Sequence, residues 1–123
     1  MKTFAILLLF TMSAMAADLS GQWVGTFAVT GSNETIPQQF TLKQNGKTLT
    51  GSGGPNNGEQ YPIKNGKIDG DSVSFELTSY NSDVGFWQFK YELKRTGQQM
   101  SGDLQLKNGN EVRTAKVSLK EVE

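Results

Sequence analysis

The stretch Trp87-Gln88-Phe89-Lys90-Tyr91-Glu92-Leu93-Lys94, with the return run that ends at Leu106, decides the fold of this 123-residue chain. Aromatic or aliphatic residues alternate in it with polar or charged ones, which is typical of a β-strand with one face in a core and the other in water. The chain then reverses at Arg95-Thr96-Gly97-Gln98, and the alternation resumes with Met100, Leu104 and Leu106. These residues predict a β-hairpin with one buried face.

Shorter copies of this pattern cover most of the remaining chain. Alternation predicts a first strand from Gly21 to Thr30. Further strands are expected through Phe40 and Leu42, through Leu49 and Gly51, from Tyr61 to Ile68, through Val73, Phe75 and Leu77, and through Ala115, Val117 and Leu119. Tight turns are expected at Asn45-Gly46, Gly70-Asp71 and Asn108-Gly109.

Two stretches interrupt the alternation. The run from Gly51 to Gly58 is rich in Gly, Pro and Asn and is expected to be a loop. The strand from Tyr61 to Ile68 is broken near Asn65-Gly66, where the residues fit either a β-bulge or another tight turn.

The number and order of these strands predict the fold class. About eight antiparallel strands with one apolar face each must either stack as a sandwich or close into a barrel. Consecutive hairpins favour an up-and-down antiparallel β-barrel, and closure removes exposed strand edges. We therefore expect an all-β, single-domain barrel of about eight strands.

The first 16 residues have the organisation of a secretory signal peptide. Lys2 precedes an apolar run from Phe4 to Phe10, and the small-residue site Ala14-Met15-Ala16 follows. The apolar run is too short for a permanent transmembrane helix, which needs about 20 residues. We expect cleavage after Ala16, a β-barrel domain over residues 17–123, a secreted or periplasmic location and no stable membrane insertion after cleavage.

Charge and composition exclude several classes of function. Removing Lys2 with the leader leaves 11 basic against 12 acidic residues, a net charge of −1. Such a domain lacks the basic surface that nucleic acids require, so no nucleic-acid partner is expected. The chain has neither cysteine nor histidine, which removes the Ser-His-Asp and Cys-His schemes and the commonest metal ligands. We expect no metal site and no cofactor.

Paired carboxylates, as in glycoside hydrolysis, are the catalytic chemistry that remains. Glu34, Glu59 and Asp83 fall in the expected long connections. Acidic residues in loops are usually solvated, and a chain of this size implies no substrate cleft. The protein is therefore expected not to be an enzyme, and a hydrolase is the third choice.

Strand order also predicts where a ligand would enter. In an up-and-down barrel successive connections lie at alternate ends, so the tight connections at Asn45-Gly46, Gly70-Asp71 and Thr96-Gly97 share one end. The longer connections, Gly31 to Ile36, Gly53 to Gly58 and Tyr80 to Asp83, share the other, where a binding mouth is expected. The inward positions nearest to this mouth are Gln38, Tyr61, Ser79, Trp87 and Arg113.

These candidate residues combine aromatic faces with polar groups, as ligand sites do. An eight-stranded barrel is just wide enough either to be filled by side chains or to hold one small ligand. In the first case Trp87 and Tyr61 are core aromatics. Arg113 is in phase with the inward residues of the last strand, and its guanidinium can extend to water at the rim.

The motif Gly21-Gln22-Trp23 resembles the G-x-W motif that opens the first strand of the calycin superfamily, the lipocalins and avidins. The resemblance implies an up-and-down barrel in which Trp23 plugs the closed end as a structural residue. Similarity to avidin extends to the segments 19–23, 31–36, 100–102 and 108–112. Val117 and Leu119 stand where avidin has a pocket-lining tryptophan, so biotin is not implied.

A second resemblance concerns two strands. Leu49-Thr50-Gly51 and the segment Asp69 to Leu77 are similar to strands of a loose group of small secreted bacterial domains. No activity follows from this similarity.

We therefore expect a non-catalytic binding module. A small, partly apolar ligand would enter at the mouth, stack on Trp87 or Tyr61, and be oriented by Gln38, Ser79 or Arg113. The alternative is a solid-core barrel that binds a protein or a cell-envelope polysaccharide through its outer surface. Oligomeric state and ligand identity stay open.

Overall fold

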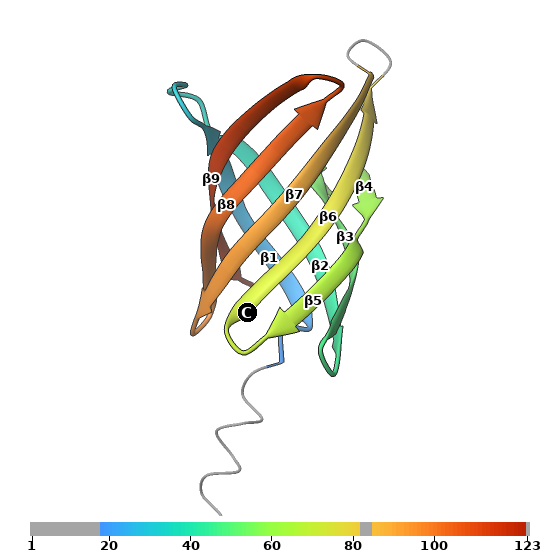
Figure 1. Ribbon diagram of the computed structural model, residues 1–123. Helices are drawn as coiled ribbons and strands as arrows, with labels where there is room; N and C mark the ends of the chain where they lie inside the picture. The colour runs from blue at the N-terminus through green and yellow to red at the C-terminus, as the bar shows by residue number, and fades with distance from the viewer. Residues whose placement is uncertain (1–17, 82–84, 123) are drawn as a thin grey trace, which may run out of the picture.

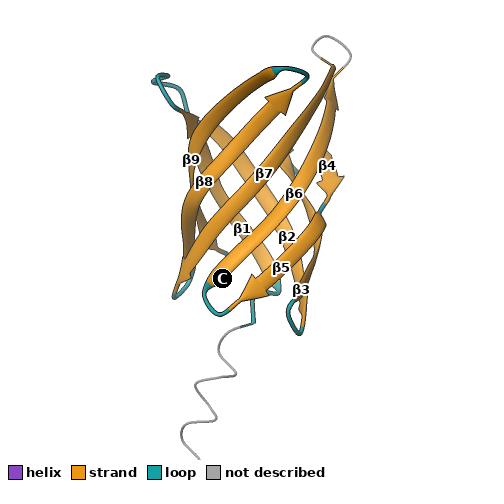
Figure 2. Ribbon diagram, viewed as in Figure 1, coloured by secondary structure: helices purple, strands orange, loops and turns teal. Residues whose placement is uncertain are grey.

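The computed structural model describes residues 18–81 and 85–122. Figures 1 and 2 show strands wrapped around one axis and joined by short connections. The strands are β1 (Gly21–Val29), β2 (Ile36–Asn45), β3 (Thr48–Asn56), β4 (Glu59–Pro62), β5 (Lys64–Asp69), β6 (Ser72–Asn81), β7 (Gly85–Thr96), β8 (Gln99–Asn108) and β9 (Glu111–Glu121). The expected signal peptide and the candidate carboxylate Asp83 lie outside the described residues.

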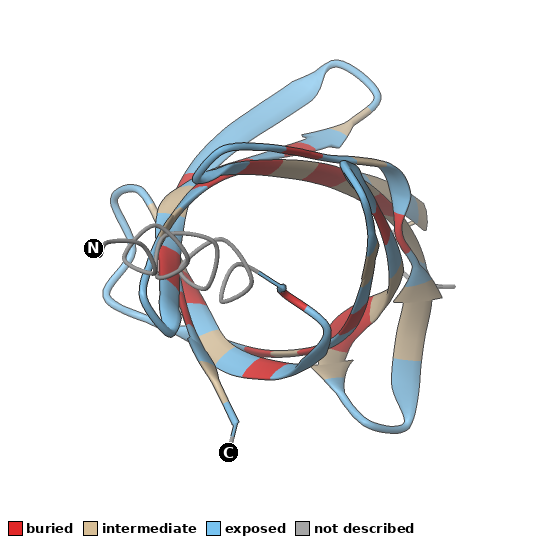
Figure 3. Cartoon of the chain, turned by 90° about the horizontal axis from the view of Figure 1, so that it is seen from below, coloured by how far each residue is buried: buried red, intermediate tan, exposed pale blue. Residues whose placement is uncertain are grey.

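The sheet closes on itself. Neighbouring strands follow the order β2-β1-β9-β8-β7-β6-β5-β3-β4, and β2 also pairs with β3, which completes a ring. Figure 3 shows this ring from below. The pairings from β1 to β3 and from β6 to β9 are antiparallel ladders between consecutive strands. The prediction of an all-β, up-and-down antiparallel barrel is therefore confirmed.

Strands β4 and β5 together fill one position of the eight-stranded ring. β4 pairs with the end of β3 that contains Ser52 and Gly53, and β5 pairs with its beginning, at Thr48 and Leu49. Asn65 has a φ of 53°, and the β5–β6 register shifts between Lys64 and Lys67. The break near Asn65-Gly66 is therefore an irregularity of the bulge kind within one strand position, and not a hairpin.

The expectation of a loop from Gly51 to Gly58 was wrong. β3 runs through Asn56, and the turn is limited to Asn57 and Gly58. A Cβ on Gly53 would lie 2.3 Å from the ring of Phe40, and a Cβ on Gly54 would lie 1.9 Å from the carbonyl oxygen of Glu59. These glycines are needed because neighbouring groups approach the strand closely, and not because the chain turns.

The two ends of the barrel differ in their connections. Turns at residues 46–47, 70–71 and 97–98 lie at the lower end in Figure 1, which we call the closed end. Connections at 30–35, 57–58 and 109–110 lie at the opposite end, the mouth. The sequence predicted the correct end for the three turns at the closed end and for the connections at 30–35 and 57–58. The connection expected over 53–58 is a two-residue turn, however, so among the described connections at the mouth only 30–35 is long.

Side chains fill the barrel below the mouth. Phe40, Phe75 and Tyr91 pack against one another with ring centroids 5.4, 5.5 and 4.6 Å apart. All three, with Trp23, are at most 1% exposed. The alternation along β2, β6 and β7 places Phe40, Phe75 and Tyr91 inward, so the predicted buried face of these strands is part of the barrel core.

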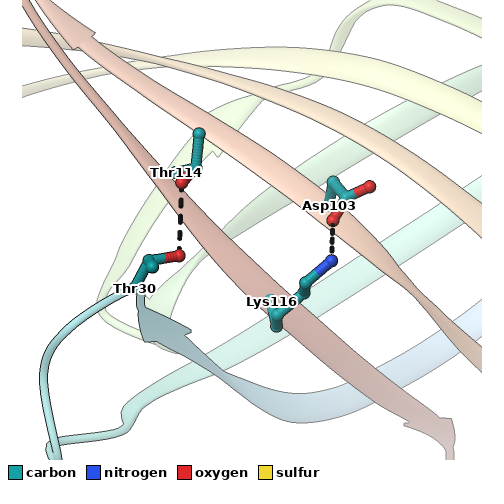
Figure 4. Close-up of polar contacts among 4 residues, drawn as sticks. All are labelled: Thr30, Asp103, Thr114 and Lys116. Carbon is teal, nitrogen blue, oxygen red and sulfur yellow. Dashed lines mark hydrogen bonds and ion pairs between the residues drawn. The ribbon is translucent and has the colours of Figure 1, made fainter.

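The seam between β1 and β9 joins the two ends of the described chain. Near the mouth, the Thr30 amide donates to the Thr114 carbonyl at 2.9 Å, and the two threonine Oγ1 atoms lie 3.2 Å apart (Figure 4). Lys116 of β9 pairs with Asp103 of β8 at 2.6 Å, and both side chains are exposed. Exposed ion pairs contribute only about 0–1 kcal/mol. Closure therefore depends mainly on the backbone ladders and the buried inner face.

The outer face of the barrel is polar on β7, where exposed Lys90, Glu92 and Lys94 alternate with inward residues. Within residues 18–81 and 85–122, no helix has the length and apolar character needed to cross a membrane.

Candidate ligand-binding cavity

A cavity of ≈ 330 Å³ lies inside the barrel on the mouth side. Its lining includes every candidate that was selected as an inward-facing position of an alternating strand, namely Gln38, Tyr61, Ser79, Trp87 and Arg113. The volume falls at the lower end of the range for ligand pockets, about 300–1,000 Å³. The structure thus brings the candidates together around one space, and ligand binding by them stays a prediction.

Apolar side chains form most of the walls. Phe27 of β1 meets Phe89 of β7 edge to face, with ring centroids 6.2 Å apart. Leu77 and Leu106 also contribute to the lining. Trp87 lies opposite Ser79 in the β6–β7 ladder, and both residues are half-buried. An aromatic ring that is partly exposed inside a barrel can stack on a ligand that enters from the mouth.

Gln38 and Tyr91 form a buried polar pair on the inner side of the cavity. The Tyr91 hydroxyl donates to Oε1 of Gln38 at 2.5 Å, and Nε2 of Gln38 donates to the carbonyl oxygen of Pro37 at 3.0 Å. Gln38 is 4% exposed and Tyr91 is 0% exposed. Burial raises the pKa of Tyr91 far above its ordinary value of 10.0, so the hydroxyl is a neutral donor at physiological pH.

The charged residues of the lining are both partnered. The Tyr61 hydroxyl donates to Glu59 at 2.6 Å, and this hydrogen bond is the main reason that the pKa of Tyr61 is raised. Arg113 contacts Oε2 of Glu111 through Nε at 2.7 Å and through Nη2 at 2.6 Å. The Arg113 side chain is 55% exposed, as expected for a long stem that reaches the rim.

Of the two candidate carboxylates that the structure describes, Glu34 and Glu59, only one lies at the cavity. Glu59 belongs to the lining, whereas Glu34 is exposed in the connection 30–35 and does not. In the part of the chain that the structure describes, no group of three or more His, Cys, Asp or Glu side chains could hold a metal ion. The described lining residues offer a ligand apolar contacts, hydrogen bonds and the partnered charges of Glu59 and Arg113.

Trp23 lies at the closed end and is absent from the cavity lining. Its indole N–H donates to the carbonyl oxygen of Leu19 at 3.0 Å, and the Arg95 guanidinium lies 5.9 Å from its ring centroid. Leu19 is 1% exposed. The segment before β1 is therefore fixed to the bottom of the core, which is the structural position that the G-x-W resemblance implies for this tryptophan.

Sequence reasoning missed part of the lining. Phe27, Leu77 and Phe89 occupy inward positions of the same alternating pattern, so the sequence pattern could have identified them as lining residues. Gly54 and Pro55 could not be found, because their segment was expected to be a loop. The bond between Gln38 and Tyr91 joins residues 53 positions apart, and no local pattern indicates such a pair.

No protein-family model and no curated protein matches the chain.

Proposed function

We propose that the protein is a secreted or periplasmic, non-catalytic binding module of calycin type that holds one small, partly apolar molecule in the mouth of its barrel. The observation that carries this proposal is the cavity of ≈ 330 Å³ with mostly apolar walls and a few polar groups. This combination is characteristic of small-molecule sites. The ligand stacks on Trp87 or Tyr61, and Gln38, Ser79 or Arg113 orients it.

The location and the family are the parts of this proposal that rest on sequence. The leader over residues 1–16 supports export. The G-x-W motif and the buried position of Trp23 at the closed end support the calycin relationship. The polar outer face of β7 argues against a barrel that is embedded in lipid, where outward residues would be apolar.

The alternative function, binding through the outer surface, has one observation in its favour. Tyr80 and Phe86 form an exposed aromatic pair on the β6–β7 hairpin, with ring centroids 4.7 Å apart. Aromatic rings of this kind can contact the apolar face of a sugar. If the alternative holds, Tyr80→Ser with Phe86→Ser abolishes retention on a cell-envelope polysaccharide and leaves cavity binding unchanged.

A titration with N-phenyl-1-naphthylamine, a neutral apolar fluorophore, tests the cavity. We expect saturable enhancement of its emission. Trp87→Ala should weaken binding about tenfold, because loss of one aromatic contact costs about 0.5–1.5 kcal/mol beyond the buried area. Trp23→Phe is the matched control at the closed end and should leave the affinity unchanged.

Two results would reject this function. One is a flat signal for this dye and for a panel of small apolar metabolites tested by competition and by tryptophan fluorescence. The other is dye binding of equal affinity in the wild type and in Trp87→Ala, which would place the dye outside the cavity.

A further inference from the structure

The bonding state of the cavity's polar groups limits what the ligand can be. The charged residues of the lining, Glu59 and Arg113, are already partnered, by Tyr61 and Glu111. On the inner side, Tyr91 keeps its proton. A ligand charge buried at that depth would lose its hydration without meeting a counter-ion, which is costly. The inner part of the cavity therefore favours a neutral group.

Gln38 is the buried polar side chain of the lining that can bond to such a group. The Pro37 carbonyl can only accept a hydrogen bond, so the amide nitrogen of Gln38 must lie toward it. The Tyr91 hydroxyl then donates to the amide oxygen. Tyr91 also lines the cavity, but its hydroxyl hydrogen is used on Gln38, so the tyrosine acts through the glutamine.

One N–H of Gln38 is left over for a ligand. A glutamine amide carries two N–H groups, and the structure shows one bond from Nε2, to Pro37, among the described residues. The Tyr91 hydroxyl already uses its hydrogen on Gln38. Ser79, half-buried in the wall, has no hydrogen-bond partner for its hydroxyl among residues 18–81 and 85–122 and can donate as well. The uncommitted donors require an acceptor on the ligand.

We propose that the ligand is a small, neutral, apolar molecule with a hydrogen-bond acceptor such as a carbonyl oxygen, and that this acceptor binds Nε2 of Gln38. This inference rests on the proposed function and adds the chemical class of the ligand. The apolar walls hold the hydrocarbon body, and a volume of ≈ 330 Å³ suits a molecule of one or two rings. Tyr91 is a positioning residue, because it holds the amide oxygen and leaves the nitrogen for the ligand.

Three probes of nearly equal shape test the proposal by equilibrium dialysis at neutral pH. They are 2-acetylnaphthalene, which is neutral with an acceptor, 2-ethylnaphthalene, which is neutral without one, and 2-naphthoate, which is an anion. We expect the ketone to bind more tightly than the ethyl compound by about two- to tenfold, which corresponds to one hydrogen bond. The anion should bind more weakly than the ketone.

Variants of the polar pair locate this preference. Gln38→Leu combined with Tyr91→Phe replaces both groups by apolar ones of similar size, so no buried partner is left unpaired. We expect this variant to bind the ketone and the ethyl compound equally. Tyr91→Phe alone should reduce the preference for the ketone while affinity for the ethyl compound stays unchanged. Gln39→Leu, the same substitution on the outward neighbour, is the control and should keep the full preference.

The outcomes separate this inference from the proposed function. Equal wild-type affinity for the ketone and the ethyl compound, tightest binding of the anion, or a preference that survives the double substitution would each overturn the acceptor proposal while the binding cavity stands. If none of the three probes binds, the proposed function fails and the inference fails with it.

Discussion

Gln38 and Tyr91 make the free energy of unfolding depend on one buried hydrogen bond. Tyr91→Phe leaves the Gln38 oxygen buried without its donor, and we expect a loss of about 1–3 kcal/mol in urea unfolding. Gln38→Leu should cost a similar amount because it leaves the hydroxyl unpaired. The double variant should be more stable than either single one. Losses that simply add would show that the two side chains do not interact in solution.

Tyr91 should also make stability depend on alkaline pH. Burial raises its pKa above the ordinary value of 10.0, so the folded state binds the proton more tightly than the unfolded chain does. This stabilisation is complete below pH 10.0 and is lost as the pH rises from there toward the folded-state pKa. The wild type should lose up to about 1.4 kcal/mol per pH unit more than Tyr91→Phe in this window.

Urea unfolding at a series of alkaline pH values measures that difference. The ultraviolet absorbance of tyrosinate provides an independent check, because the Tyr91 phenol should ionise only when the barrel unfolds. Reversible ionisation of all 3 tyrosines in the folded protein would contradict the expectation.

Single residues also show what sequence alone could and could not predict. The inward-facing candidates could be predicted because side chains alternate strictly between the two faces of a strand. They line one cavity in the structure. This alternation does not identify hydrogen-bond partners. Tyr91 appeared only as one inward aromatic of its strand, and its link to Gln38 became visible only when the barrel placed β2 and β7 across the interior from each other.

At the scale of elements, β3 gives the clearest prediction. Gly53→Ala is expected to destabilise the barrel by about 1–3 kcal/mol, the usual cost of overpacking. The new Cβ would lie 2.3 Å from the Phe40 ring, which is itself 1% exposed. Gly58→Ala in the adjacent turn is the matched control, since its Cβ meets nothing closer than the Asn56 side chain at 3.4 Å. Equal unfolding midpoints for the two variants would contradict the close packing of β3.

The same strand explains why element boundaries could not all be read from the sequence. Glycine, proline and asparagine indicate turns by local conformational preference, and in 51–58 this preference is overridden by tertiary contacts. Elsewhere the alternation of apolar residues and the positions of the tight turns indicated the same strands, and these strands were predicted correctly. The sequence alone could not distinguish a bulge from a hairpin in the broken strand at 61–68. The structure distinguishes them because β4 and β5 both pair with β3.

At the scale of the whole molecule, alternating strands could not by themselves separate a sandwich from a barrel. The order of hairpins favoured the barrel, and the pairings β1–β9 and β2–β3 complete the closure. A closed ring has no free edge from which strands can peel off one at a time. We therefore expect the mouth and the closed end to unfold together as one cooperative unit.

Hydrogen exchange with bound ligand tests this cooperativity. A ligand that binds only the folded state, at a free concentration of 100 times its Kd, stabilises by about 2.7 kcal/mol and lowers the unfolded population about 100-fold. With 2-acetylnaphthalene in the mouth, amides around Trp23 at the closed end should therefore exchange about 100-fold more slowly. In Trp87→Ala, where the affinity is expected to be about tenfold weaker, the same ligand concentration should slow this exchange only about tenfold. Protection confined to the mouth would mean that the closed end opens independently, because a ligand can protect distant amides only through an opening that also releases it.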